Sequence, residues 1–125
     1  MERLDIIRRN DRTSIPKVSM AKIKWTKKAG RIFFGRVEEA YIKFGLTTAK
    51  KWQQERIRIE HHLELHPESY TPEAFLADRK RRYRSCHIMK RFKLVYYYSK
   101  TSDTVNVVDI WDTRQAPETL KNRIK

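Results

Sequence analysis

The last third of the chain consists of three apolar runs separated by short polar breaks. Residues 83–88, 92–99 and 104–111 are rich in aromatic and β-branched side chains, which favour β-strands. The breaks at residues 89–91 and 100–103 have the length of hairpin turns. Because such short turns join antiparallel neighbours, this pattern predicts a three-stranded antiparallel meander.

The last two predicted strands are apolar on both faces. Val107 and Val108, for example, are successive apolar positions, and successive side chains of a strand point to opposite sides of the sheet. Helices are therefore expected to cover one face, and the other face must be partly covered or used for binding. In the tyrosine run at residues 96–98, alternate members are expected to fill the core under the helices, which leaves only Tyr97 exposed.

The N-terminal half carries a different period. Residues 21–25 alternate between lysine and apolar side chains and predict a short strand. Thr26 follows as an N-cap, because its hydroxyl can accept a hydrogen bond from the first helical turn. Apolar residues then recur at helical spacing from Ala29 to Phe44, and Gly45 supplies a C-terminal stop.

A second helix is expected to begin with Thr47 or Thr48 as its cap and to end before Pro67. Its apolar residues share one face: Ala49, Trp52, Ile59 and Leu63. Since only a few residues separate the two helices, they should lie antiparallel as a hairpin.

Two smaller elements complete the predicted order. Residues 71–73 (Thr-Pro-Glu) are expected to begin a helical turn with proline at its first position, and residues 118–125 to form a short C-terminal helix. The order β-α-α-β-β-β predicts an α+β fold, in which a helical hairpin packs on a small antiparallel sheet. Residues 1–19 show no period and predict a flexible extension ahead of a domain at residues 20–125, with Met20 as an alternative start.

The net charge of the chain limits the classes of partner that this domain is expected to bind. The 125 residues carry a formal net charge of +14, which favours a nucleic acid, an anionic membrane or an acidic protein as partner. No apolar run reaches the roughly 18 residues of a membrane span, and the N-terminus lacks the apolar core of a secretory signal. The single cysteine, Cys86, predicts a buried thiol in a reducing compartment, so a cytoplasmic location is expected.

Several segments, taken in their order along the chain, resemble the RelE/ParE toxins of bacterial type II toxin–antitoxin systems. The resemblance runs from about Lys22 to Arg123. Its pieces are Ile23-Lys24-Trp25-Thr26, Tyr41-Ile42-Lys43-Phe44-Gly45, Tyr83-Arg84-Ser85, Phe92-Lys93-Leu94-Val95-Tyr96 and Asp109-Ile110-Trp111-Asp112-Thr113-Arg114-Gln115-Ala116-Pro117. The last piece is the most specific, because ParE-type members often close the final strand with an aromatic residue, two further residues and Arg-Gln-x-Pro.

The resemblance implies a growth-inhibiting toxin that an adjacently encoded antitoxin neutralises, by laying an amphipathic helix or strand on the sheet and hairpin. ParE-like toxins poison DNA gyrase, whereas RelE-like toxins cut messenger RNA on the ribosome. The ending at residues 114–117 resembles the ParE branch, and the C-terminal tyrosine of RelE-like enzymes is missing, with Leu120 near its place. Gyrase inhibition is therefore the first expectation. A ribosome-associated endoribonuclease and a degenerate toxin that only binds its antitoxin are the alternatives.

For an endoribonuclease, the resemblance implies catalysis by cations without a metal or other cofactor. The 2′-hydroxyl of the RNA is the nucleophile, so the protein must remove its proton, stabilise the phosphorane and protonate the leaving oxygen. Lys93, Arg114 and Arg84 fall at or near the positions of basic residues in RelE-like enzymes. If the turn at residues 89–91 is tight, His87 lies opposite Lys93 and is expected to serve as acid or base.

Each of these residues also has a structural interpretation. Lys93 and Arg84 fit ordinary strand charges that discourage edge pairing, and Arg114 fits a pairing with Asp112. His87 fits a half-buried strand histidine.

Further basic and aromatic residues are expected to bind nucleic acid or the antitoxin. They are Arg79, Lys80, Arg81, Arg82, Lys90, Arg91 and Tyr97. On the second helix, His62 and His66 share a face with no evident third ligand, so no metal site is expected there.

Overall fold

A four-stranded mixed sheet is the base on which the other elements pack. The computed structural model describes residues 20–124, so the predicted extension at residues 1–19 lies outside it. The strands β1 (Lys22–Trp25), β2 (Tyr83–Ile88), β3 (Phe92–Ser99) and β4 (Thr104–Asp112) lie in the order β1-β4-β3-β2. The antiparallel meander of β2, β3 and β4 is confirmed, and β1 joins it parallel to β4.

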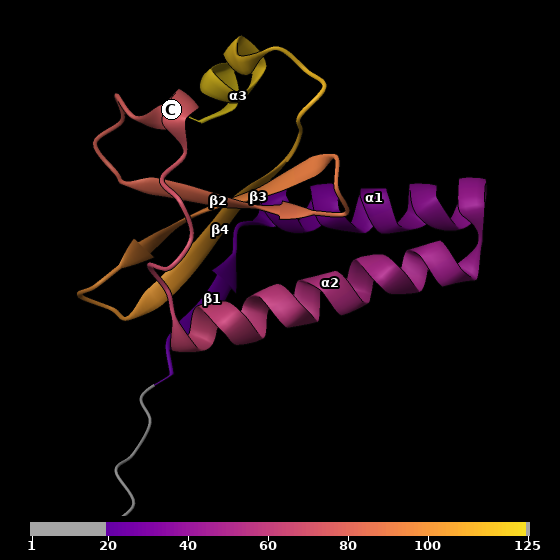
Figure 1. The fold of residues 1–125 in the computed structure, drawn as a ribbon, viewed down its shortest axis with the longest axis horizontal. Coiled ribbons are helices and arrows are strands. Elements are labelled where there is room, and N and C mark those ends of the chain that lie inside the picture. Colours follow the sequence, from indigo (N-terminus) through magenta and orange to yellow (C-terminus); the bar gives the residue numbers. More distant parts are fainter. Residues whose placement is uncertain (1–19, 125) are drawn as a thin grey trace, which may run out of the picture.

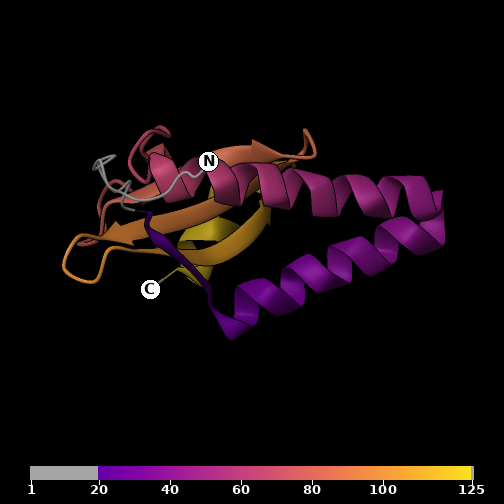
Figure 2. The same cartoon turned by 90° about the horizontal axis from the view of Figure 1, so that it is seen from below.

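The two long helices form the predicted hairpin on one face of the sheet. Helices α1 (Lys27–Phe44) and α2 (Leu46–Leu65) run side by side and extend well beyond the end of the strands (Figures 1 and 2). The Oγ1 of Thr26 accepts a hydrogen bond from the Ala29 amide at 3.0 Å, so this N-cap is confirmed. No helix within residues 20–124 combines the length and hydropathy that crossing a bilayer requires.

The connection between the helices is tighter than the sequence indicates. Gly45, at φ 93°, ends α1 and is also the residue before α2, which begins at Leu46. The prediction that Thr47 or Thr48 caps the second helix is therefore wrong. A glycine in this left-handed region reverses the chain within one residue, which leaves no loop in which a separate cap could stand.

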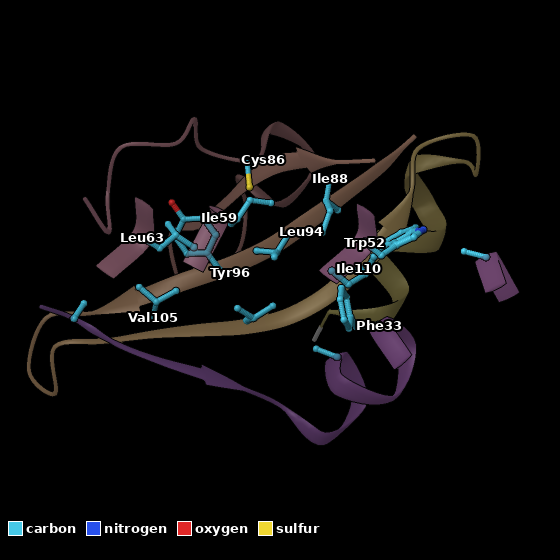
Figure 3. Packing of buried hydrophobic residues seen from close by; sticks show 14 residues of the cluster. Phe33, Trp52, Ile59, Leu63, Cys86, Ile88, Leu94, Tyr96, Val105 and Ile110 are labelled. Atoms are coloured by element: carbon cyan, nitrogen blue, oxygen red, sulfur yellow. The ribbon is translucent and has the colours of Figure 1, made fainter. Parts of the chain in front are cut away.

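The main core lies between the hairpin and the sheet. All four residues predicted for the buried face of α2 are at most 7% exposed. Trp52, Ile59 and Leu63 from α2 pack with Phe33 from α1 against strand residues (Figure 3). The strand residues that Figure 3 labels are Cys86, Ile88, Leu94, Tyr96, Val105 and Ile110.

The opposite face of the sheet is covered by a second, smaller core. Figure 1 shows α3 (Pro117–Arg123) on the side of the sheet away from α2. Together with the 3₁₀ helix η1 (Ala74–Leu76), α3 buries a set of apolar side chains against the strands. They are Leu76, Tyr83, Val95, Trp111, Leu120 and Ile124. The predicted C-terminal helix is thus present, and it closes most of the face that the sequence left open.

The helical turn predicted to begin at residues 71–73 starts later in the chain. Pro72 forms an isolated antiparallel bridge with Arg84 on the edge of β2. Glu73 is extended and caps η1, and its carboxylate accepts a hydrogen bond from the Phe75 amide at 3.0 Å. The segment pairs first with the sheet edge and coils only afterwards, because β2 offers it free backbone hydrogen-bonding groups.

Two isoleucines of α2 test the packing of the hairpin. Ile59 is fully buried and Ile57 is 54% exposed. We expect Ile59→Ala to lower the free energy of unfolding by about 2–5 kcal/mol, since it leaves a cavity in the core. Ile57→Ala should change it by less than about 0.5 kcal/mol. Urea unfolding followed by circular dichroism measures both, and equal losses would contradict this placement of the helix.

Candidate functional site

Lys93 is bound to a buried carboxylate. Glu73 is 3% exposed, and its Oε1 accepts hydrogen bonds from Lys93 Nζ at 3.0 Å and from Ser85 Oγ at 2.7 Å. Burial raises the pKa of Glu73, but its hydrogen bonds from the Phe75 amide, Ser85 and Lys93 outweigh this effect and hold the pKa below the ordinary value. Glu73 is therefore ionised at neutral pH and offsets the charge of Lys93.

Two aromatic rings lie near the ammonium group of Lys93, whose side chain is 23% exposed. Its Nζ lies 5.7 Å from the ring centre of Phe75 and 5.9 Å from that of Trp111, which is within the range of cation–π attraction. Phe75 belongs to η1, and Trp111 lies opposite Lys93 on β4. Lys93 is therefore a half-buried residue in a built pocket and not an ordinary exposed strand charge.

The other two strand residues of the predicted site lie on different faces of the sheet. His87 is directly opposite Lys93, as expected, but its side chain is exposed and hydrogen-bonds to no described residue. Arg84 lies opposite Tyr96, which faces the helical hairpin, and Arg84 Nη1 donates to the Tyr70 carbonyl oxygen at 2.7 Å. The sheet thus brings His87 and Lys93 together and directs Arg84 to its other face.

Arg114 forms the pairing with Asp112 that the sequence offered as an alternative. Its Nε and Nη2 donate to the two carboxylate oxygens at 3.0 and 2.7 Å, and its backbone amide donates to Oδ1 at 3.0 Å. The Arg114 side chain, through hydrogen bonds that outweigh desolvation, lowers the pKa of Asp112 to about 2. Arg114 is 59% exposed, so the pair fixes its orientation at the surface.

The basic run that precedes β2 is divided between two roles. Arg79 donates to the carbonyl oxygens of Ile124 at 3.1 Å and Lys121 at 2.7 Å, at the end of α3. Arg81 places its guanidinium 4.4 Å from the ring centre of Tyr97. The other two residues of the run, Lys80 and Arg82, are exposed.

Tyr97 is less exposed than the sequence predicts. The alternation itself is confirmed, because Tyr96 and Tyr98 both pack into the core under the helices. Tyr97, on the opposite face, is half-buried because it packs edge-on against Tyr83 at 5.7 Å and is covered by Arg81. The expectation that it stands exposed is wrong, since the second core reaches this far along the sheet.

A cleft between the hairpin and the end of the meander contains basic residues that the sequence analysis missed. Arg36 and Lys43 line it from α1, together with Arg91 and Arg114, and its volume is about 280 Å³. The exposed Lys90 belongs to the same turn as Arg91. The available signal was the spacing of Arg36 and Lys43, which are seven residues apart and therefore lie on one side of the helix.

His62 of α2 and His66, which follows the helix, make contacts within the described chain. His62 Nε2 lies 2.6 Å from Ser69 Oγ, and its ring packs against those of His66 and Tyr70. Residues 20–124 contain no group of three or more histidine, cysteine, aspartate or glutamate residues placed to bind a metal ion. Cys86 is buried, as predicted, and burial raises the pKa of its thiol to about 12.

The Asp112–Arg114 pair makes stability depend on pH. The pKa of Asp112 is about 2 in the folded protein against an ordinary 3.8, so its contribution is complete above about pH 4 and is lost as the pH falls to about 2. We expect the difference in unfolding free energy between the natural chain and Asp112→Asn to shrink over this interval. Urea titrations from about pH 2 to 6 measure it, and a difference that stays constant would contradict the pairing.

Comparisons with known proteins agree with this fold. No family model and no curated protein matches the sequence. Among solved structures, the chromosomal ParDE toxin–antitoxin system of P. aeruginosa matches with a TM-score of 0.58 at 14% identity, covering 75% of this chain and 97% of the other. A metal-bound toxin from Helicobacter pylori matches with a TM-score of 0.56 at 19% identity, covering 76% and 97%. The chain therefore has the α+β fold of the ParE/RelE-like toxins, as the sequence segments predict.

Proposed function

We propose that this chain is the toxin of a type II toxin–antitoxin pair and that it inhibits growth by binding DNA gyrase, without cleaving RNA. The observation that carries this choice is the burial of Glu73 against Lys93. The charge of Lys93 is offset by a buried carboxylate, and two aromatic rings lie near its ammonium group. Lys93 therefore acts as a structural part of the sheet. The fold shared with the two toxins supports the toxin class itself.

RNA cleavage makes demands that the other candidate residues do not meet together. The phosphorane needs cations that are free to approach its extra negative charge, and the proton transfers need a paired acid and base. Arg114 uses Nε and Nη2 on Asp112, Arg84 lies on the far face, and His87 has no partner among the described residues. A binding inhibitor requires none of this chemistry.

The helical hairpin supports a function through protein contacts. Five large apolar side chains within residues 34–46 of the hairpin are exposed, and exposed apolar surface is typical of interaction sites when it is extensive. They are Phe34, Tyr41, Ile42, Phe44 and Leu46. Figure 2 shows that this part of the hairpin extends beyond the sheet. These residues and the charge of +14 suit an acidic, partly apolar partner, which the proposal assigns to the antitoxin and to gyrase.

Induction of the chain in a bacterial host tests the proposal. The natural chain is compared with His87→Ala and with the double variant Glu73→Gln/Lys93→Met, which neutralises both members of the buried pair and so leaves no unpaired charge in the core. We expect all three to stop growth with a DNA-damage response and intact messenger RNA. Message integrity is followed on northern blots, and DNA synthesis by thymidine incorporation.

Folding of each variant is checked first by its circular dichroism and its unfolding midpoint. Prompt loss of translation with cleaved messages, abolished by His87→Ala or by the double variant, would overturn the proposal in favour of an endoribonuclease. Absence of any growth arrest by the natural chain would instead identify a degenerate toxin.

A further inference from the structure

We propose that the cleft between the hairpin and the β2–β3 turn binds single-stranded nucleic acid, one nucleotide at a time, with a phosphate on its cationic rim and a base on its apolar floor. The cleft lies between α1, α2, the turn before β3 and the residues after β4. This inference does not depend on gyrase as the target, because it is tested by oligonucleotide binding in the absence of gyrase. Of the exposed apolar residues of the hairpin named above, only Phe44 also lines the cleft.

The rim consists of cations whose positions are fixed by carboxylates. Glu39 accepts hydrogen bonds from Arg36 Nη1 at 3.2 Å and from Lys43 Nζ at 2.9 Å. Asp112 holds Arg114 through Nε and Nη2. Each carboxylate binds only some of the N–H donors of its arginine. No hydrogen bond to the described residues is made by Nη1 of Arg114 or by Nε and Nη2 of Arg36. Donors that are already ordered lose little entropy when they bind an anion.

Arg91 completes the rim from the β2–β3 turn. The turn is unusual because Met89 and Lys90 both have positive φ angles, of 53° and 59°. The backbone amide and the Oγ1 of Thr113 each donate to the Arg91 carbonyl oxygen at 2.9 Å, which ties the turn to the end of β4. This tie brings Arg91 next to Arg114, so four cations surround the cleft with two carboxylates among them.

The floor and one wall of the cleft are apolar. Trp52 and Phe92 meet edge to face, with ring centres 5.0 Å apart, and the Arg36 guanidinium lies 4.7 Å from the Phe92 ring centre. Phe44 lines the same cleft with a side chain that is 71% exposed. An exposed aromatic ring beside guanidinium groups is the arrangement on which single-stranded nucleic acids stack their bases.

The size and composition of the cleft favour a nucleotide over an acidic peptide. A volume of about 280 Å³ admits one small flat group and is too small for a helix about 10 Å wide. Three of the four rim cations are arginines, and a guanidinium group carries five N–H donors, so the donors not used on Glu39 or Asp112 remain for phosphate oxygens. The net charge of +14 adds long-range attraction to a polyanion.

A pair of matched phenylalanine variants tests the stacking without changing any charge. Phe44 and Phe34 are both on α1 and both 71% exposed, but only Phe44 lines the cleft. Binding of the full-length chain to fluorescein-labelled oligo(dT) and oligo(U) of about eight nucleotides is measured by anisotropy. We expect Phe44→Ala to weaken binding about fivefold or more and Phe34→Ala to leave it unchanged. The two probes show whether DNA or RNA is preferred.

A pair of double variants tests the rim. Lys43→Ala/Arg91→Ala removes two cations from the cleft, and Lys22→Ala/Lys24→Ala removes two exposed cations from β1. We expect the first to reduce the slope of log affinity against log salt by about 1.4, and the second to have little effect. Equal effects of the two double variants, or of the two phenylalanine variants, would overturn the proposal and indicate general electrostatic attraction. A second result would also overturn the proposal. In that result, an acidic peptide displaces the oligonucleotide while the cleft variants bind it as tightly as the natural chain does, which places the binding on another surface.

Discussion

A single β-bulge in β4 decides which side chains reach each face of the sheet. The pairing passes from Val95 with Asp109 to Tyr96 with Val107, so Val108 is the extra residue. Without it, the strict alternation of a strand would not place Val107 and Ile110 together in the core under the helices. The same shift directs Asp109 and Trp111 to the opposite face. The second core and the Lys93 pocket both depend on this one inserted residue.

Asp109 illustrates what the bulge makes possible. Its carboxylate is fully buried and forms an ion pair with Arg123 of α3. Burial raises the pKa of Asp109 against the opposing effect of Arg123, so the carboxylate is held at an energetic cost and needs its partner. Arg79 binds the carbonyl oxygens of Lys121 and Ile124 at the same, C-terminal end of this helix. Two arginines, one on α3 and one before β2, thus fasten a helix of only seven residues over the sheet.

The elements could be predicted from sequence where a local period determines them. The meander and the buried face of α2 follow from spacing alone, and the residues at 83–88 and 92–99 form the strands predicted for them. The state of Lys93 could not be predicted, because Glu73 acquires its partners from residues 75, 85 and 93, which only the folded chain brings together. The resemblance put Arg84 and Lys93 in one candidate catalytic set. The two side chains lie on opposite faces of the sheet, because side chains alternate between the faces along each strand. Arg36 and Lys43 were overlooked because a helix gives no indication of which strand end will lie next to it.

The one-residue connection at Gly45 has a consequence for how this protein can evolve. The hairpin closes without a loop, and its outer part contributes more surface than core. Side chains there, such as Phe34 and Ile42, are exposed and are not constrained by packing. Substitutions there alter recognition at almost no thermodynamic cost. Selection on binding partners can therefore act on the arm while the sheet keeps its sequence requirements, which separates the part of the gene that sets specificity from the part that sets folding.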